Sequence, residues 1–236
     1  MSEAPAPAPA STAPAAPVQR APLPDPLRRN WFWFTAQQIA QLLFTIWFRV
    51  RAYGIENLPT GGALLLINHQ SFLDPLMVGL PLSRPLSYLA RENLFQVPFV
   101  GWVLRHTYVI PISRERGGAE SLRESIRRMD HGFLVGIFPE GTRSSDGKLG
   151  ELKSGFISLV RRTKVPVIPV GVAGAFESFP RNARFPRMGQ IRVVYGQPLD
   201  PTRLIELSQP GREAELVEWT RNAIQVCLDE ANAHRK

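Results

Sequence analysis

Cysteine is nearly absent from this sequence: Cys227 is the only one in 236 residues. A single cysteine excludes an intramolecular disulfide and suits a protein of a reducing compartment. Acidic residues are also scarcer than basic ones, 20 against 28, which gives a formal net charge of +8. A basic chain favours an anionic partner, and composition leaves three open: nucleic acid, an anionic membrane or a phosphorylated substrate.

Large apolar side chains are rare at the beginning of the chain. Residues 1–26 contain eight Pro and eight Ala. Such a segment cannot bury enough apolar surface to offset the entropy of ordering, so residues 1–27 are predicted to form a disordered, partly extended tail. The tail lacks the basic start and apolar run of a secretory signal, and we do not expect it to be one.

Charge is absent from most of the next segment, WFWFTAQQIAQLLFTIWFRV at residues 31–50. At 100° per residue its polar side chains form one stripe, which consists of Gln37, Gln38, Gln41, Thr45 and Arg49. Because Trp and Phe favour the bilayer interface, residues 28–50 are predicted to be an amphipathic membrane-interface helix with its glutamines toward the headgroups. The alternative is a terminal helix packed on the domain.

From residue 51 to residue 236 apolar runs alternate with helical patterns, which predicts one α/β domain with a mixed, largely buried sheet flanked by helices. One helical pattern places Leu122, Ile126 and Met129 on a common face. The predicted strands are Ala63–Ile67, Leu86–Ala90, Thr107–Ile112, Phe133–Phe138, Pro166–Val172 and Gln190–Tyr195.

The stretch NHQSFLDP follows the apolar run at Ala63–Ile67 and places His69 in the loop after a buried strand. Asp74 and Pro75 are typical of a helix start, with Asp74 as the N-cap. If the two side chains meet across this corner, the carboxylate holds the imidazole as a general base. Otherwise Asp74 only caps a helix and His69 only bonds the backbone. Ser71 lies outside any nucleophile-elbow motif, so an acyl-enzyme is disfavoured.

A second polar group follows the predicted strand at Phe133–Phe138. Gly141 allows the backbone to approach a ligand, and Arg143 offers a fork for a phosphate. Glu140 can accept hydrogen bonds from hydroxyls or orient that arginine, and Arg114 follows another strand. Without a partner site, this loop could equally be a surface turn with an ion pair.

Taken together, these motifs resemble those of the glycerolipid acyltransferase family, most closely the bacterial 1-acyl-sn-glycerol-3-phosphate acyltransferases. The motifs read NHQSFLD, PISR, FPEGTRS and VPVIPV and begin at residues 68, 111, 138 and 165. The resemblance covers residues from about 45 to 200 and implies the fold of that family. A His-x4-Asp pair is weak by itself, but FPEGTR about seventy residues later makes the match specific.

The resemblance implies a role for each matching residue. His69 would be the general base and Asp74 its orienting partner. Arg91 matches a basic position near the reacting carbonyl. Arg114, Glu140, Gly141, Thr142 and Arg143 would bind the acceptor, Pro166 and Pro169 match the fourth motif near the acyl donor, and Lys153 and Gly155 match a structural Lys-x-Gly. Ser113 departs from the usual second motif and leaves head-group preference open.

The implied activity moves a fatty acyl group from acyl-CoA or acyl-carrier protein to the free hydroxyl of 1-acylglycerol 3-phosphate, giving phosphatidic acid. The resemblance implies no cofactor and no metal, and lysophosphatidic acid, the acyl thioester, membrane lipids and acyl-carrier protein as candidate partners. It implies a location at the cytoplasmic face of the inner membrane.

Three alternatives stay open at this point. The acceptor could be lyso-ornithine lipid, glycerol 3-phosphate or another lysophospholipid, and a lipid hydrolase is a different class. A nucleic-acid-binding protein is disfavoured, because the basic residues are scattered among apolar runs and form no stripe with aromatic platforms.

Overall fold

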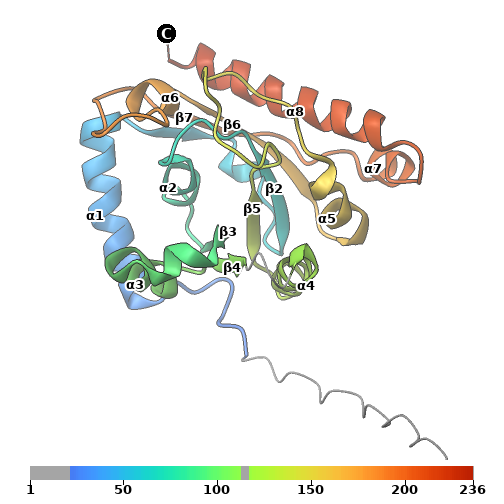
Figure 1. Ribbon diagram of the computed structural model, residues 1–236, viewed down its shortest axis with the longest axis horizontal. Helices are drawn as coiled ribbons and strands as arrows, with labels where there is room; N and C mark the ends of the chain where they lie inside the picture. Colours follow the sequence, from blue (N-terminus) through green and yellow to red (C-terminus); the bar gives the residue numbers. More distant parts are fainter. Residues whose placement is uncertain (1–21, 113–116, 236) are drawn as a thin grey trace, which may run out of the picture.

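The computed structural model describes residues 22–112 and 117–235, and seven strands of this part form one sheet (Figure 1). The order across the sheet is β1-β7-β6-β2-β5-β3-β4. β6 and β7 are antiparallel and every other pair is parallel, so the predicted mixed sheet is confirmed. The strands are β1 Arg51–Tyr53, β2 Ala63–Ile67, β3 Leu86–Arg91, β4 Ile110–Ile112, β5 Leu134–Ile137, β6 Val167–Ala173 and β7 Arg192–Tyr195.

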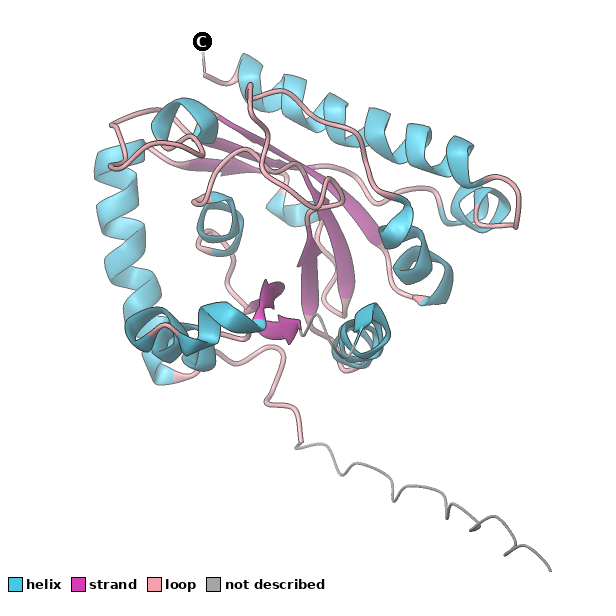
Figure 2. Ribbon diagram, viewed as in Figure 1, coloured by secondary structure: helices cyan, strands magenta, loops and turns pink. Residues whose placement is uncertain are grey.

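Helices cover both faces of the sheet (Figure 2). They are α1 Trp31–Phe48, α2 Asp74–Gly79, α3 Pro98–His106, α4 Gly117–Asp130, α5 Ile157–Arg162, α6 Ala175–Ser178, α7 Pro201–Leu207 and α8 Glu213–Ala233. Short 3₁₀ turns lie at Ile55–Asn57, Glu92–Gln96 and Ser154–Phe156. Because apolar side chains project from both faces of the central strands, the sheet needs this cover on two sides.

β2 shows how the core is divided into two layers. All five of its residues are buried, and successive side chains of a strand point to opposite faces. Leu64 and Leu66 pack with α4, α5 and α8, and Leu65 and Ile67 pack with α2 and with Phe48 of α1. A side chain at Gly171 in β6 would collide with the backbone of Cys227, so glycine lets α8 lie close against the sheet.

Helix α1 confirms a helix in the predicted segment but corrects its orientation. Gln37 is only 1% exposed, and its amide donates to the carbonyls of Leu80 and Leu82, over 2.7 and 2.8 Å. Gln41 also donates to Leu80. The expectation that the glutamines face headgroups is therefore wrong for these two, which instead fasten α1 to the domain.

The opposite side of α1 is an exposed apolar face, which we define as Ile39, Leu42, Leu43, Ile46 and Trp47. Both ends of the helix are bonded to the domain. Asn30 caps the first turn and its backbone N–H donates to the hydroxyl of Tyr108. At the other end, the N–H of Ile191 donates to the carbonyl of Phe48 over 3.0 Å. None of the helices in the described part of the chain has the length and apolar content needed to cross a bilayer.

Candidate active site

The candidate site lies at the carboxyl end of β2, where the buried strand gives way to a polar loop. Asn68 is fully buried and extends the β2–β6 pairing with its side chain. Its amide nitrogen donates to the carbonyl of Val172 over 3.0 Å, and its amide oxygen accepts from the N–H of Val172 over 2.7 Å. This pair fixes the point where the loop leaves the sheet, a role that the sequence analysis did not identify.

His69 and Asp74 meet as predicted across the corner between β2 and α2. Nδ1 of His69 lies 2.8 Å from Oδ2 of Asp74, which is completely buried. Asp74 is the first residue of α2 and Leu73 is the N-cap, so the predicted cap is displaced by one residue. The same oxygen accepts the backbone N–H groups of Gln70 and Ser71, each over 2.7 Å, and so holds the loop rather than its own helix.

Three N–H groups converging on one oxygen determine which ring nitrogen is available for chemistry. Burial raises the pKa of Asp74, and the hydrogen bonds from His69 and from the backbone oppose that rise. Since Oδ2 of Asp74 already accepts two backbone N–H groups, we assign it as an acceptor for His69 as well, with the proton of the imidazole on Nδ1. Nε2 of His69 is then unprotonated and can accept a proton from a substrate. The imidazole keeps contact with solvent, because 19% of its side chain is exposed.

The second motif holds the same histidine from the other side. Oε1 of Glu140 accepts the backbone N–H of His69 over 2.6 Å, and its Oε2 accepts the N–H of Gly150 over 3.0 Å. The N–H of Ser144 donates to the carbonyl of His69 over 2.7 Å. Burial raises the pKa of Glu140, and its hydrogen bonds from the backbones of His69 and Gly150 oppose the rise. The sequence predicts Glu140 at the acceptor or beside Arg143, whereas in the structure both its oxygens accept from backbone N–H groups of the site.

An aromatic ring completes the support of the imidazole. The ring of Phe138 is stacked on that of His69, with centroids 4.1 Å apart and planes 24° apart. Tyr88 in turn stacks on Phe138, with centroids 6.0 Å apart. Phe138 was predicted only as the end of a strand, because nothing in a single aromatic residue indicates that its ring contacts a histidine 69 residues earlier.

Arg143 and Lys153 supply positive charge beside the pair of His69 and Asp74. The guanidinium of Arg143 lies 5.7 Å from the ring centre of Phe72, a half-exposed residue of the first motif. Within the described residues it has no carboxylate partner, and it is thus available to an anion. Gly141 has a φ of +67°, and the side chain of Lys153 lies directly beside it. Lys153 was expected to be structural, and the structure adds its ammonium group to this loop.

Comparison with known proteins decides the family. The model of the family described as "Acyltransferase" matches residues 49–173, which is more than half of the chain and includes every residue of this site. The chain belongs to the acyltransferase family.

Individual relatives agree with this assignment. The chain is 30% identical over 193 residues to a chloroplastic 1-acyl-sn-glycerol-3-phosphate acyltransferase of Arabidopsis thaliana, covering 80% of this chain and 54% of the plant protein. It is 29% identical to the 1-acyl-sn-glycerol-3-phosphate acyltransferase of Bacillus subtilis, covering 75% of this chain and 86% of that protein. The chain thus spans about half the length of the plant relative and most of the bacterial one.

A solved structure shares the fold. The crystal structure of the 1-acyl-sn-glycerophosphate acyltransferase of Thermotoga maritima matches with a TM-score of 0.70 and 26% sequence identity, over 85% of this chain and 79% of that one. The predicted fold class is therefore confirmed, and so is the resemblance to the bacterial enzymes of this type.

The remaining predicted residues of the chain take varied positions. Arg91 ends β3 and pairs with Ile112 at the same edge of the sheet as His69. Arg114 lies outside the described residues. Thr142 is exposed in the loop beside Arg143. Pro166 precedes β6, at the end of the sheet opposite to His69. Its carbonyl accepts from the N–H of Leu64, which is a structural contact.

The hydroxyl of Ser71 is directed away from the imidazole. Its hydroxyl donates to the carbonyl of Phe179 over 2.7 Å and accepts from the N–H of Leu73. A serine nucleophile would need to donate to the base instead, so this geometry adds to the argument against an acyl-enzyme.

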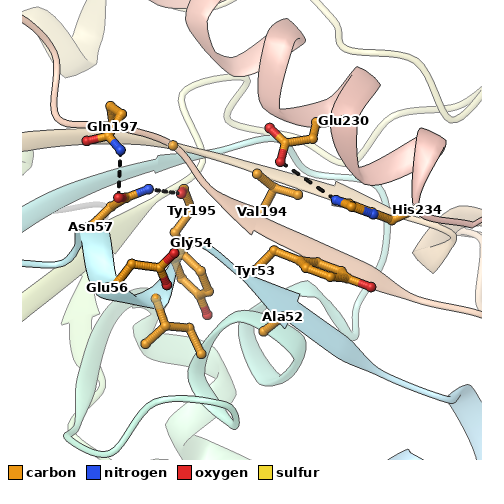
Figure 3. Close-up of a pocket in the computed structure, with 12 residues that line it drawn as sticks. Ala52, Tyr53, Gly54, Glu56, Asn57, Val194, Tyr195, Gln197, Glu230 and His234 are labelled. Atoms are coloured by element: carbon orange, nitrogen blue, oxygen red, sulfur yellow. Dashed lines mark hydrogen bonds and ion pairs between the residues drawn. The ribbon is translucent and has the colours of Figure 1, made fainter.

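Other polar groups of the chain lie apart from the site. A hollow of about 590 Å³ is lined by β1, β7 and the end of α8, and contains none of the predicted site residues (Figure 3). There His234 stacks on Tyr53 with ring centroids 3.9 Å apart and lies 3.7 Å from Glu230. In residues 22–112 and 117–235 no group of three or more His, Cys, Asp or Glu side chains is arranged to hold a metal ion.

Proposed function

We propose that this chain transfers a fatty acyl group from an acyl thioester to the free hydroxyl of 1-acylglycerol 3-phosphate and so forms phosphatidic acid. The observation that carries the proposal is the buried contact between His69 and Asp74, which leaves Nε2 of the imidazole free. The names of the curated relatives support the same acceptor. The acyl donor is acyl-CoA or acyl-carrier protein.

The reaction follows from the orientation of the imidazole. Nε2 of His69 takes the proton of the acceptor hydroxyl while that oxygen attacks the thioester carbonyl. The tetrahedral intermediate then expels the thiolate, which receives the proton from the imidazolium. Asp74 stabilises the imidazolium between these two steps. The acyl group passes directly from sulfur to oxygen.

General-base catalysis supplies only part of the rate, about 10²–10⁴-fold. Positioning of the two substrates and stabilisation of the oxyanion must supply the rest. The contacts of His69 with Glu140, Ser144 and Phe138 support the first contribution, because they hold the base rigidly. We assign oxyanion stabilisation to Arg91 or to backbone N–H groups of the site.

The acceptor phosphate is assigned to the loop after β5. Arg143 provides a planar fork suited to phosphate oxygens, and Lys153 adds a second cation beside Gly141. Thr142 adds a hydroxyl in the same loop. Arg114 completes the set by its motif alone.

Because the acceptor is a lipid, the site must work at a membrane surface. We propose that the exposed apolar face of α1 lies in the interface of one leaflet, with the enzyme at the cytoplasmic face of the inner membrane. The residues of this apolar face would otherwise remain in water, whereas burial of an apolar side chain is favourable by about 1.5–3 kcal/mol.

Purified protein and a panel of lysolipids test the proposal. Lysophosphatidic acid, lyso-ornithine lipid, glycerol 3-phosphate and lysophosphatidylcholine are each offered with acyl-CoA and with acyl-carrier protein. The expected result is a much higher kcat/KM for lysophosphatidic acid than for the other three. Release of fatty acid without any acceptor would instead indicate a hydrolase and contradict the proposal.

A further inference from the structure

The loop between α6 and β7, residues 179–190, combines exposed apolar side chains with unpaired positive charge. Phe185 is 79% exposed and Met188 is 63% exposed. Arg181, Arg184 and Arg187 are exposed as well, and none of the three has an ion pair within the described residues. The loop sequence FPRNARFPRMGQ contains no acidic residue. Each arginine therefore adds a positive charge that no neighbouring carboxylate in the loop offsets.

One end of this loop is joined to the C-terminal end of α1. The N–H of Gly189 donates to the carbonyl of Trp47 over 3.3 Å, and the N–H of Ile191 donates to the carbonyl of Phe48 over 3.0 Å. Figure 1 shows the loop after α6 beside that end of α1. Exposed Met188 is therefore the neighbour of the residue that bonds to Trp47, so the loop and the C-terminal end of α1 are joined at this point.

The other end of the loop is joined to the catalytic segment. The carbonyl of Phe179 accepts the hydroxyl of Ser71 over 2.7 Å, two residues from His69. The N–H of Arg187 donates to the carbonyl of Ser178 over 2.7 Å, which closes the loop at its base. The segment is thus a compact projection held between the general base and the membrane-facing helix.

A basic hollow adjoins the same end of α1. It is lined by Thr45, Arg49, Val50, Arg51, Gln190 and Arg192. The guanidinium of Arg192 is fixed by the carbonyls of Arg49 and His234, whereas Arg49 and Arg51 are exposed. The positive charge of the loop therefore extends along the end of the helix.

We propose that residues 179–190 form a second membrane contact, in which Phe185 and Met188 enter the interface of an anionic bilayer and the three arginines bind its phosphate groups. This inference builds on the proposed function, which places only α1 in the interface. A single helix in the plane of the interface leaves the domain free to rotate about the helix axis. A second contact fixes the orientation of the domain relative to the bilayer. The loop then holds the His69 segment at a constant height above the lipid.

The choice of a bilayer follows from the combination of side chains. Apolar tips beside arginines match the layered chemistry of an interface, in which hydrocarbon lies below a plane of phosphates. Each basic residue near an anionic surface strengthens binding by roughly fivefold. The three arginines together should thus contribute on the order of a 100-fold preference for anionic over zwitterionic vesicles.

Sedimentation with vesicles tests the charge and the apolar tip separately. Vesicles of phosphatidylcholine with about one third phosphatidylglycerol are compared with phosphatidylcholine alone. Arg181→Gln/Arg184→Gln/Arg187→Gln should lose most of the preference for the anionic vesicles, and Phe185→Ser/Met188→Ser should bind both kinds on the order of 100-fold more weakly. The control for the charge is Arg162→Gln/Lys164→Gln, at the last residue of α5 and in the loop after it. The control for the apolar tip is Ile205→Ser/Val226→Ser, on α7 and α8. All four positions are exposed away from the loop at residues 179–190, and both variants should bind like the parent protein.

A fluorescent probe at the loop tip gives a direct reading of depth. Cys227→Ala removes the single native thiol, and Phe185→Cys or Ile205→Cys then carries an environment-sensitive dye on the full chain. On anionic vesicles the dye at position 185 should shift to the blue and be quenched by brominated lipid, whereas the dye at 205 should do neither. Bound protein with a dye at position 185 still in water would overturn the proposal. Because neither substrate is present, failure of acyl transfer would count against the proposed function and not against this contact.

Discussion

At the scale of single residues, the site depends on one carboxylate oxygen that accepts three hydrogen bonds. Asp74→Asn replaces that acceptor with an amide, whose nitrogen would oppose an N–H group or whose oxygen would hold the imidazole less firmly. We expect kcat to fall by on the order of 10³–10⁴, by analogy with the loss when the aspartate of a catalytic triad becomes asparagine. His69→Ala should abolish transfer. Asp229→Asn, at an exposed position on α8, is the matched control, and near-normal turnover by His69→Ala would refute the mechanism.

The contacts of Glu140 in the structure differ from the role that the sequence predicts for it. Its two oxygens hold the backbones of His69 and Gly150, so Glu140→Gln places an amide nitrogen against one of these N–H groups. We expect kcat to fall roughly tenfold to a hundredfold, with both KM values little changed, since an unsatisfied buried donor costs about 1–3 kcal/mol. Glu151→Gln, exposed in the same segment, should leave kcat unchanged. A change confined to the KM of the acceptor would show that Glu140 binds substrate instead.

Arg143 should act on the acceptor and not on the donor. Arg143→Ala removes a charge-assisted contact worth about 1.5–3 kcal/mol, so the KM for lysophosphatidic acid should rise roughly tenfold to a hundredfold. Arg143→Lys keeps the charge but loses the planar fork, so its KM for lysophosphatidic acid should lie between those of the parent protein and of Arg143→Ala. Initial rates with each substrate varied in turn separate the effects. An increase in the KM of the acyl thioester alone would contradict the assignment.

The sequence could locate these residues but not all of their contacts. His69 and Asp74 are five residues apart, and a strand followed by a helix start brings both side chains to the same corner of the chain. Glu140 lies 71 residues from the histidine whose backbone it holds. No local pattern encodes that bond, and the stacking of Phe138 on the imidazole is hidden for the same reason.

At the scale of elements, α1 shows how far a periodic pattern reaches. The period separates a polar stripe from an apolar face, but the proposed interfacial helix would have the domain on one side and lipid on the other. Periodicity cannot assign the stripes to these two neighbours. The carbonyls of Leu80 and Leu82 at the end of α2 decide the matter, because they need donors and Gln37 supplies them. The strand β1 escaped prediction because its three residues include a charged one and form no apolar run.

This orientation predicts different effects for two adjacent glutamines. Gln37→Leu leaves the carbonyl of Leu82 without its donor and the carbonyl of Leu80 with Gln41 alone, and should lower the free energy of unfolding by about 1–3 kcal/mol. Gln38→Leu, at an exposed position, should change it by less than about 0.5 kcal/mol. Urea unfolding followed by circular dichroism measures both. Equal effects would mean that α1 does not dock through Gln37 in solution.

At the scale of the whole molecule, both ends of α1 are bonded to one folded domain, and this decides how the protein meets a bilayer. The helix has 18 residues, or about 27 Å at ~1.5 Å each, slightly less than the ~30 Å of the hydrocarbon core. To span, it would have to break the bonds of Gln37 and place the amide in hydrocarbon. It would also separate Asn30 from Tyr108 or Phe48 from Ile191 by the thickness of a membrane. We therefore expect the helix to lie in one interface.

Single-cysteine labelling in sealed vesicles tests this topology. Arg28→Cys and Arg51→Cys place thiols at exposed positions on either side of α1, and the N-cap Asn30 is left intact. Cys227→Ala removes the native thiol. Burial raises the pKa of that thiol to about 12, so it reacts little with a maleimide and adds little background labelling. An impermeant maleimide added outside should label both positions in vesicles of one orientation and neither in vesicles of the other. Labelling of one position from each side would show that α1 crosses the bilayer, and the contacts of Gln37 would then have to break on insertion.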